Sequence, residues 1–391
     1  MIKKISLLFL FIISMESGFS QQKQLSPLSK ISLLTVGTGE DLAAKFGHSA
    51  IRFQDPTLGI DEVYGYGTYD FEDPNFYLNF TKGKLSYTIS RMPFNYFKRS
   101  YEFEQRWVKE QELYLNLEER KKIVLFLENN LLPENRKYKY DFLFDNCATR
   151  IPEVFEKTLR DGLKYDYSYL ENPYTFRELI HQNLHVNSWS NFGIDLALGA
   201  VIDVKASAYE HMFLPLYVYQ QMKHTSINGE PFVKGESIVL DIATKKDDTL
   251  FVLTPVFWLG IFLFIVIYIT YKDFKEKRRT AWLDTVLFMV TGLAGTLILF
   301  LWFFTDHDAT KMNLNALWAF APNLIIVFLI GKNKLTKWLK YYVMLLLILL
   351  LATIILWVLK IQIFSILITF VLLALGARYT YLAYFLKYYK K

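Results

Sequence analysis

Long apolar runs fill the C-terminal part of the chain, and they limit what it can fold into more than any other feature. Residues 251–391 consist of apolar runs separated by short basic loops, whereas residues 21–250 hold most of the charge. About 20 apolar residues in a row are long enough to cross a bilayer as a helix. The sequence therefore predicts one soluble domain, residues 21–250, followed by a transmembrane domain, residues 251–391.

Five segments of the apolar part are candidate spans, because each approaches the length needed to cross the hydrocarbon core. They are residues 251–271, 282–304, 315–331, 341–359 and 363–384. The third has the weakest signal, since Pro322 and Asn323 interrupt it. The prediction is an all-α bundle of five transmembrane helices.

The loops between these spans differ in positive charge. Basic residues are concentrated in residues 272–279, 332–340 and 387–391, whereas the other two loops carry chiefly Lys311 and Lys360. By the positive-inside rule the basic loops and the C-terminus are cytoplasmic, and residues 21–250 lie outside. The net charge of +6 thus reflects membrane topology and does not predict nucleic-acid binding.

The N-terminus has the pattern of an export signal. Lys3 and Lys4 precede an apolar run, residues 5–13, and the small residues Gly18 and Ser20 follow. This order predicts a secretory signal peptide, residues 1–20, that is cleaved after Ser20. It agrees with an extracytoplasmic soluble domain, because it is independent of the charges in the loops.

Cys147 is the only cysteine of the chain, so it cannot form an intramolecular disulfide. A free thiol in an oxidising compartment is open to oxidation, which makes nucleophilic catalysis the expected benefit. A helix is predicted from about Ile151, with Asp145 or Asn146 as its cap, and its backbone N–H groups are expected to lower the pKa of the thiol. Because Pro152 is tolerated only in a first turn, the helix either starts near Ile151 or begins with a distorted turn.

The soluble part is predicted to be strand-rich first and helical later. Strands are predicted at residues 31–36, 46–53, 63–69 and 85–89, and helices at residues 97–116 and 117–130. The alternation in residues 46–53 predicts a strand that is buried on one face only. This order indicates an α+β domain.

His48 is the best-placed base for the thiol among the six histidines, because it follows a glycine at the start of a predicted strand. The alternative is a structural or solvated histidine. A third polar group normally orients the imidazole. Tyr64 and Tyr66 are candidates for it, as are Asp61 and Glu62, and the sequence does not choose among them.

The loop after the second span, residues 305–315, is expected at the outer surface of the membrane. Its candidate residues are Asp306, His307 and Asn313. They either contact a lipid head group, approach the catalytic pocket, or are the polar residues that any loop outside a membrane carries.

Three short motifs carry a family resemblance: Gly47-His48-Ser49-Ala50, Val63-Tyr64-Gly65-Tyr66-Gly67 and Asp145-Asn146-Cys147-Ala148-Thr149-Arg150. Together they resemble the Lnb N-terminal periplasmic domain family, whose members resemble a permuted papain-like (NlpC/P60-like) thiol fold with the histidine before the cysteine. The resemblance implies that Cys147 is the nucleophile and His48 the base, with Asn146 and Arg150 as supporting candidates. Gly65 departs from the polar residue expected in many relatives.

The membrane part also resembles Lnb-type lipoprotein N-acyltransferases. This resemblance implies an inner-membrane enzyme that transfers an acyl chain from a phospholipid, through a Cys147 thioester, to the α-amino group of a diacylated lipoprotein. It implies no metal and no cofactor. Two alternatives remain open: a thiol hydrolase, either a peptidoglycan endopeptidase or a phospholipase, and a non-catalytic membrane assembly factor in which Cys147 is inert packing.

Overall fold

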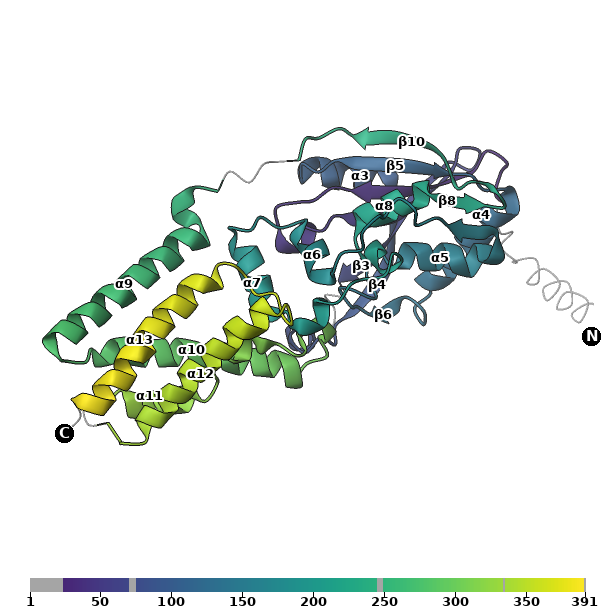
Figure 1. Ribbon diagram of the computed structural model, residues 1–391. Helices are drawn as coiled ribbons and strands as arrows, with labels where there is room; N and C mark the ends of the chain where they lie inside the picture. Colours follow the sequence, from purple (N-terminus) through teal and green to yellow (C-terminus); the bar gives the residue numbers. More distant parts are fainter. Residues whose placement is uncertain (1–23, 70–74, 245–248, 333–334, 390–391) are drawn as a thin grey trace, which may run out of the picture.

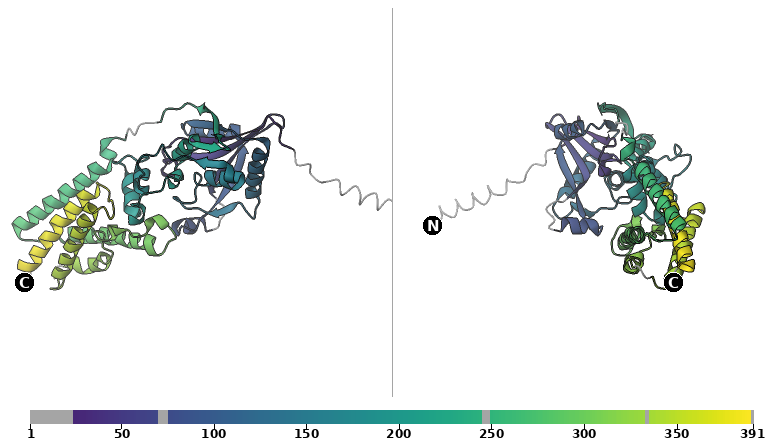
Figure 2. Two further views of the ribbon diagram at one scale, coloured as in Figure 1. Left: turned by 45° about the vertical axis from the view of Figure 1, so that its right-hand side comes forward. Right: turned by 90° about the vertical axis from the view of Figure 1, so that its left-hand side faces the viewer.

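The structure of the protein is a computed structural model that describes residues 24–69, 75–244, 249–332 and 335–389 (Figure 1). The predicted signal peptide, residues 1–20, lies outside the described residues. A mixed α+β domain is followed by a helical part, as predicted. The two parts lie end to end (Figure 2).

A seven-stranded antiparallel sheet forms the centre of the first domain, with the strand order β10-β5-β1-β2-β3-β4-β6. Its strands are β1 (Lys30–Val36), β2 (His48–Asp55), β3 (Ile60–Tyr69), β4 (Ser86–Pro93), β5 (Val108–Leu113), β6 (Lys137–Lys139) and β10 (Val233–Leu240). A smaller sheet joins β7 (Leu163–Tyr165), β8 (Thr225–Ile227) and β9 (Glu230–Pro231). The four strands predicted from the N-terminal part are all present.

Helices and short turns complete this domain. The α-helices are α2 (Phe76–Thr81), α3 (Phe94–Phe103), α4 (Leu117–Leu131), α5 (Arg150–Leu159), α6 (Phe176–His181), α7 (Trp189–Ala197) and α8 (Pro215–Lys223). The 3-10 turns are η1 (Leu42–Ala44), η2 (Arg160–Gly162), η3 (Ala200–Ile202) and η4 (Glu210–Phe213). Helix α4 opens with a capping box between Asn116 and Glu119 and matches its predicted start.

Strand β2 is covered on both faces, so the prediction of a half-buried strand is wrong. Ile51 packs in one core cluster with residues of α4 and α5, and Ala50 packs in another with Phe97 of α3. Even Arg52 is only 9% exposed, since it pairs with Asp61 and Glu110. A strand covered on both faces shows no clean alternation of polar and apolar residues.

The predicted helix over residues 97–116 is also wrong in its second half. Helix α3 ends at Phe103, and β5 then lies between β1 and β10 in the sheet. The strand is rich in charged residues, but Val108 and Leu113 are buried and the Gln111 amide donates to Tyr219 and Glu236. Its partner β10 lies far along the chain, so local periodicity did not indicate the pairing.

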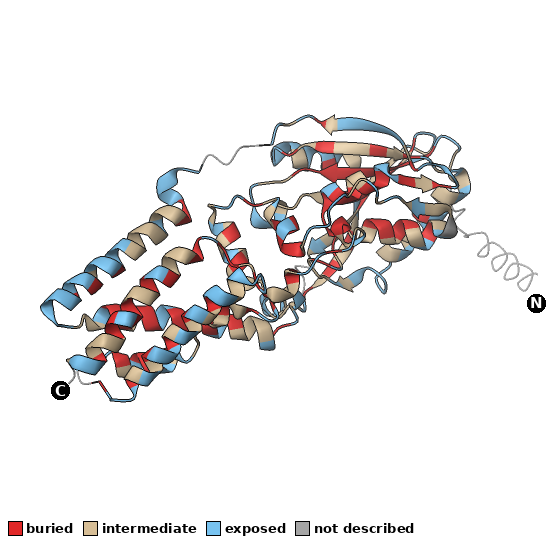
Figure 3. Cartoon of the chain, viewed as in Figure 1, coloured by how far each residue is buried: buried red, intermediate tan, exposed pale blue. Residues whose placement is uncertain are grey.

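Four helices of the second part are long and apolar enough to cross a membrane. They are α9 (Pro255–Glu276), α10 (Ala281–Phe303), α12 (Leu339–Val358) and α13 (Ile368–Tyr388). The remaining elements are the helix α11 (Asn323–Ile330) and the turns η5 (Phe251–Leu253), η6 (Asp308–Thr310) and η7 (Leu314–Ala316). Many side chains of α9 and α12 are exposed in the isolated chain (Figure 3), as expected for surfaces that face lipid.

The third predicted span is not a continuous helix over residues 315–331, because α11 covers only its second half. The segment before α11 packs directly on the α10 backbone: a Cβ at Gly295 would lie 1.8 Å from the carbonyl oxygen of Ala319. The Asn323 side chain donates to Thr291 and accepts from Tyr342. A segment inside a membrane must satisfy its polar groups within the protein. These polar contacts do so where helical hydrogen bonds are missing.

The two ends of the helical part are distinct. Leu314 donates to the Gln362 side chain at the end beside the sheet domain, whereas Arg279 donates to the carbonyl oxygens of Ile330 and Lys332 at the opposite end. The C-terminal end of α13 lies at that opposite end too (Figure 1). The chain therefore passes five times along the helical part, with α11 in the irregular third passage.

Candidate active site

Cys147 lies in a short turn before α5, and Asn146 holds that turn in place. The Asn146 carboxamide oxygen accepts hydrogen bonds from the N–H groups of Ala148 (2.7 Å) and Thr149 (3.0 Å). Its amide nitrogen donates to the carbonyl oxygens of Phe142 and Phe213. Asn146 is only 4% exposed, so its role is to fix the backbone that presents the cysteine.

Helix α5 begins at Arg150, which places Pro152 in the first turn, where proline is tolerated. Of the two starts that the sequence allowed, a helix near Ile151 is the one observed. The predicted cap is wrong, because Thr149 occupies the N-cap position and Asn146 caps the preceding turn instead. Cys147 is therefore separated from the helix start by Ala148 and Thr149.

His48 is the first residue of β2, and the preceding glycine is required there. Gly47 has a φ of +82°, and a Cβ at this position would lie 2.7 Å from the carbonyl oxygen of Val36. The imidazole stacks on Tyr101 with a centroid distance of 6.4 Å. Its Nε2 lies 3.5 Å from the position of a Cβ on Gly65, so the glycine that departs from the family pattern faces this histidine.

The thiol of Cys147 meets the strand that carries His48. The backbone N–H of Ser49 lies close enough to the Cys147 sulfur to lower the pKa of the thiol. A Cβ on Gly67, in the irregular part of β3, would lie 3.7 Å from the Cβ of Cys147. The fold thus brings Cys147, His48 and Gly65 to one place, between the cysteine turn and the adjoining strands β2 and β3.

Both titratable groups are neutral at rest near pH 7. Burial raises the pKa of the Cys147 thiol, against hydrogen bonds from the N–H groups of Ser49, Cys147 and Ala148 and the charge of Arg106. Burial and the same Arg106 charge lower the pKa of His48 to about 4. The predicted lowering of the thiol pKa is therefore wrong, because burial outweighs the backbone N–H groups.

Arg106, which the sequence did not single out, is the charged group that acts on both side chains. It is 6% exposed, and its guanidinium lies 4.9 Å from the centre of the Tyr101 ring that stacks on His48. Its Nε donates to the Gly37 carbonyl oxygen and its Nη1 pairs with Glu104, both at 2.8 Å. Its Nη2 has no hydrogen-bond partner among the described residues.

Tyrosine rings surround the other side of Cys147. The thiol acts electrostatically on Tyr138 and Tyr140 as well as on Tyr101. Tyr140 stacks on Tyr87 with a centroid distance of 4.1 Å, and Tyr87 contacts Tyr69 at 4.9 Å. Cys147 therefore has an aromatic environment that favours an uncharged thiol.

The candidate third residues point elsewhere. Tyr64 donates to Glu128 of α4 at 2.6 Å, on the face of the sheet opposite to Tyr101. Tyr66 packs edge-on against Tyr138 and lies beneath Arg150. Asp61 is bound to Arg52. Neither tyrosine is shown bonded to His48.

Arg150 supports the cysteine turn from outside. It forms a two-pronged ion pair with Asp145, at 2.5 and 2.6 Å, and its guanidinium lies 4.4 Å from the centre of the Tyr138 ring. This pair closes the turn that holds Cys147, since Asp145 precedes the turn and Arg150 follows it. The geometry assigns Arg150 a positioning role.

The loop candidates connect the two domains. Asp306 pairs with Lys139 of β6 at 3.0 Å, and His307 lies 3.3 Å from the carbonyl oxygen of Thr81 in α2. Asn313 is fully buried and donates to the carbonyl oxygens of Leu196 and Ala197. The loop therefore docks against the sheet domain, which none of the interpretations open from the sequence predicted.

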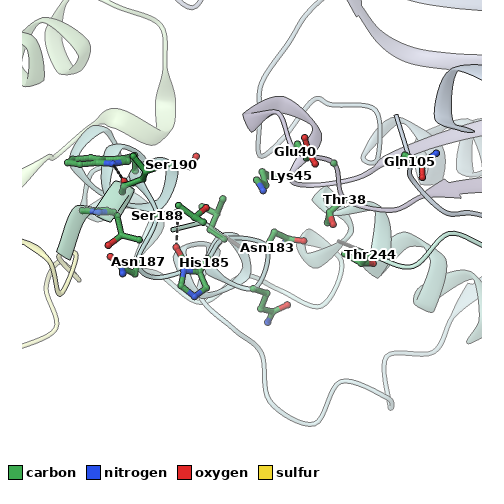
Figure 4. A pocket seen from close by; sticks show the side chains of 18 of the residues that line it. Thr38, Glu40, Lys45, Gln105, Asn183, His185, Asn187, Ser188, Ser190 and Thr244 are labelled. Atoms are coloured by element: carbon green, nitrogen blue, oxygen red, sulfur yellow. Dashed lines mark hydrogen bonds between the residues drawn. The ribbon is translucent and has the colours of Figure 1, made fainter. Parts of the chain in front are cut away.

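A cavity of about 830 Å³ lies between the sheet domain and the start of α9. One side is formed by the loop from Thr38 to Lys45 and the other by the segment from Asn183 to Ser190 (Figure 4). Leu253, Thr254 and Pro255 close it at the first residues of the first span. Glu104 and Gln105, the residues before Arg106, also line it.

A metal has no obvious place in the part of the chain described: no group of three histidine, cysteine, aspartate or glutamate side chains is close enough to hold one there.

Comparison with known proteins identifies both parts of the chain. Residues 19–182 match the family described as the Lnb N-terminal periplasmic domain, and residues 245–391 match the Lnb transmembrane domain. No curated protein and no solved structure matches the chain. The two matches follow each other in the order of the two observed domains.

Proposed function

Because this chain belongs to the Lnb-type lipoprotein N-acyltransferase family, a family of membrane enzymes that modify lipoproteins, we propose that it transfers an acyl chain from a phospholipid to a lipoprotein. The acceptor is the α-amino group of the diacylglyceryl-modified N-terminal cysteine. One observation carries the proposal: the Ser49 N–H lies close enough to the Cys147 sulfur to lower the pKa of the thiol, so the only thiol lies next to His48.

The first half-reaction forms a thioester. Neutral His48 accepts the thiol proton, and the Cys147 sulfur attacks the carbonyl carbon of the phospholipid ester. The N–H groups at Cys147 and Ser49 stabilise the negative oxygen of the tetrahedral intermediate. When the intermediate collapses, the ester C–O bond breaks and His48 returns the proton to the departing lysophospholipid oxygen.

The second half-reaction consumes the thioester. The uncharged α-amino group of the lipoprotein attacks the thioester carbonyl carbon, and His48 accepts a proton from the nitrogen as the new N–C bond forms. The C–S bond breaks, and the sulfur takes this proton to restore the thiol. The low pKa keeps His48 in its base form at neutral pH, but it also disfavours the imidazolium that forms in both steps.

The membrane domain suits this pair of substrates, because both the phospholipid and the diacylated lipoprotein are held in a bilayer. The protein is a multi-pass membrane protein with a periplasmic domain. We place the C-terminus in the cytoplasm, on the basic loops and on its position at the end of the bundle away from the sheet domain. A cysteine introduced at Lys387 in a Cys147→Ala background would then resist membrane-impermeant maleimides in intact spheroplasts; ready labelling would contradict this orientation.

Mass spectrometry of lipoprotein N-terminal peptides tests the function. In a strain whose N-acylation depends on this protein, Cys147→Ala and His48→Ala should leave lipoproteins diacylated, while the exposed substitution Arg99→Gln should not. Full triacylation by the Cys147→Ala variant would contradict the mechanism.

The same system separates the alternatives. A hydroxylamine-sensitive acyl group on Cys147 distinguishes a lipid-using enzyme from a peptidoglycan endopeptidase or an inert assembly factor. Transfer of that group to an amine, in place of release as free fatty acid, distinguishes the acyltransferase from a phospholipase.

A further inference from the structure

Arg106 has a hydrogen-bond donor that nothing in the described chain uses. Its Nε and Nη1 are bound to Gly37 and Glu104, whereas Nη2 is buried without a partner. A buried polar group without a partner costs free energy, and a guanidinium costs more than a neutral group. Such a group is retained most readily where a ligand supplies the missing acceptor.

The surroundings hold this guanidinium rigidly next to the reacting groups. Arg106 lies against the ring of Tyr101, which stacks on His48. A Cβ on Gly39 would come within 3.1 Å of the Arg106 Cδ, so the loop that carries Gly39 packs closely on the arginine stem. Glu104, the one carboxylate bound to Arg106, is 44% exposed and offsets only part of a buried charge.

The charge of Arg106 opposes the step that His48 must perform. A cation near His48 disfavours the imidazolium that forms when the histidine takes the thiol proton. An anion bound to Arg106 would offset this effect at the moment the substrate is present. The missing partner is therefore expected to be a negatively charged part of the substrate.

The cavity at the membrane junction indicates which negatively charged part of the substrate binds Arg106. Gly39, Glu104 and Gln105, which adjoin Arg106 in space or sequence, line it, and its other end reaches Pro255 at the start of α9. The first residues of a span lie at the level of lipid head groups. Lys45 places a positive charge in the lining, beside the carboxylates of Glu40 and Glu104.

We propose that Arg106 binds the phosphate of the phospholipid donor, which enters through this cavity, and so places the ester of the donor at Cys147. A guanidinium matches a phosphate geometrically, and the pairing is strong where water is excluded. The oxyanion of the intermediate is the other anion of the reaction, but the donors proposed for it above are the N–H groups at Cys147 and Ser49. This inference rests on the proposed function.

Donors with and without a phosphate test the role of Arg106. With the full-length protein in detergent, the Arg106→Gln variant should lose about 10- to 100-fold in kcat/KM for a phospholipid donor, the range expected for one charged hydrogen bond. With a diacylglycerol donor of the same chains, its rate should stay within about 2-fold of the wild type. The Arg99→Gln variant, which removes an exposed arginine of α3, should match the wild type with both donors.

Equal losses with both donors, or no loss with either, would overturn the proposal, because a structural or oxyanion role does not depend on a phosphate. The variant Arg106→Lys keeps the charge but loses the two-pronged geometry of the guanidinium. Its kcat/KM should lie between those of the wild type and Arg106→Gln with the phospholipid donor only.

A binding experiment separates this inference from the acyltransferase itself and does not depend on the folding of any Arg106 variant. In the Cys147→Ala protein, which cannot turn over, dihexanoylphosphatidylcholine should raise the Tm more than dihexanoylglycerol at equal concentration. Equal shifts would overturn the phosphate site. A phosphate-dependent shift in a protein whose wild-type form transfers no acyl group would overturn the proposed function and leave the phosphate site standing.

Discussion

The backbone N–H of Ser49, the residue that follows His48, lies next to the sulfur of Cys147 and lowers the pKa of the thiol. This contact joins β2, near the start of the chain, to the turn before α5. Its consequence is chemical as well as structural, because an N–H donor stabilises both a thiolate and the oxyanion of an attacked ester. The pair is nevertheless neutral at rest, since burial dominates the pKa of both side chains.

The neutral pair predicts how Cys147 reacts with a simple electrophile. Because the thiol pKa is raised and only the thiolate reacts, the rate of alkylation by iodoacetamide should keep increasing with pH past the usual cysteine range of about 8.5. A preformed thiolate–imidazolium pair would instead give a plateau near neutral pH. Mass spectrometry of the labelled peptide measures the rate without interference, as no other cysteine is present.

The urea-unfolded chain is the control for this experiment, because its thiol titrates near the ordinary pKa. A plateau between pH 5 and 7 in the folded protein would contradict the neutral pair.

The depressed pKa of His48 predicts a loss of stability in acid. Its folded pKa is about 4, against 6.5 unfolded, so between these values the unfolded chain binds a proton that the folded chain does not. Stability therefore increases with pH across this window, and the contribution of His48 is lost as the pH falls from about 6.5 to 4. Differential scanning of the full chain in detergent should show a smaller decrease of Tm in this window for His48→Gln than for the wild type.

The sequence predicted the candidate pair because its signal is local. A lone cysteine and a Gly-His strand start are visible in short motifs, and both side chains meet in the structure. Arg106 gave no such signal, since its place beside the candidate pair depends on a long-range contact with the Gly37 carbonyl oxygen.

The errors in the predicted fold also arise because long-range contacts leave no local signal in the sequence. Strand β5 was predicted as a helix because its charged residues do not show the pattern of a buried strand. Its pairing with β1 and β10 becomes evident only in the folded sheet. The sequence indicated an interruption of the third span at Pro322 and Asn323, where α11 begins, but hydropathy does not register the close approach of Gly295 to Ala319. Where the signal is local, as in the capped start of α4 and the long apolar run of α12, the predicted bounds were close.

Two neighbouring glycines of β3 should respond differently to alanine. Gly67 has a φ of +93°, so Gly67→Ala should cost about 1–2 kcal/mol in backbone strain next to Cys147. Gly65 is not in this conformation, and its added Cβ would meet His48 at an ordinary 3.5 Å, so Gly65→Ala should change stability by less than about 1 kcal/mol. Thermal unfolding of both variants measures the difference, and equal Tm values would contradict the strained conformation at Gly67.

Asn313 is predicted to hold the two domains together. Its side chain donates to the carbonyl oxygens of Leu196 and Ala197 and accepts from the backbone of Asn315, all in a fully buried position. Asn313→Ala leaves these groups without partners, which costs about 1–3 kcal/mol.

The backbone bonds from Gly199 to Ala309 and from Ala200 to Met312 cross the same contact, so their amides report on its opening. In the full-length Asn313→Ala protein, hydrogen exchange at Gly199 and Ala200 should be about 10- to 100-fold faster, the kinetic equivalent of that cost. Lys311→Ala, which removes an exposed partner of Asp308 from the same loop, is the matched control and should leave both rates nearly unchanged. Unchanged exchange in Asn313→Ala would show that the domains are held by other contacts.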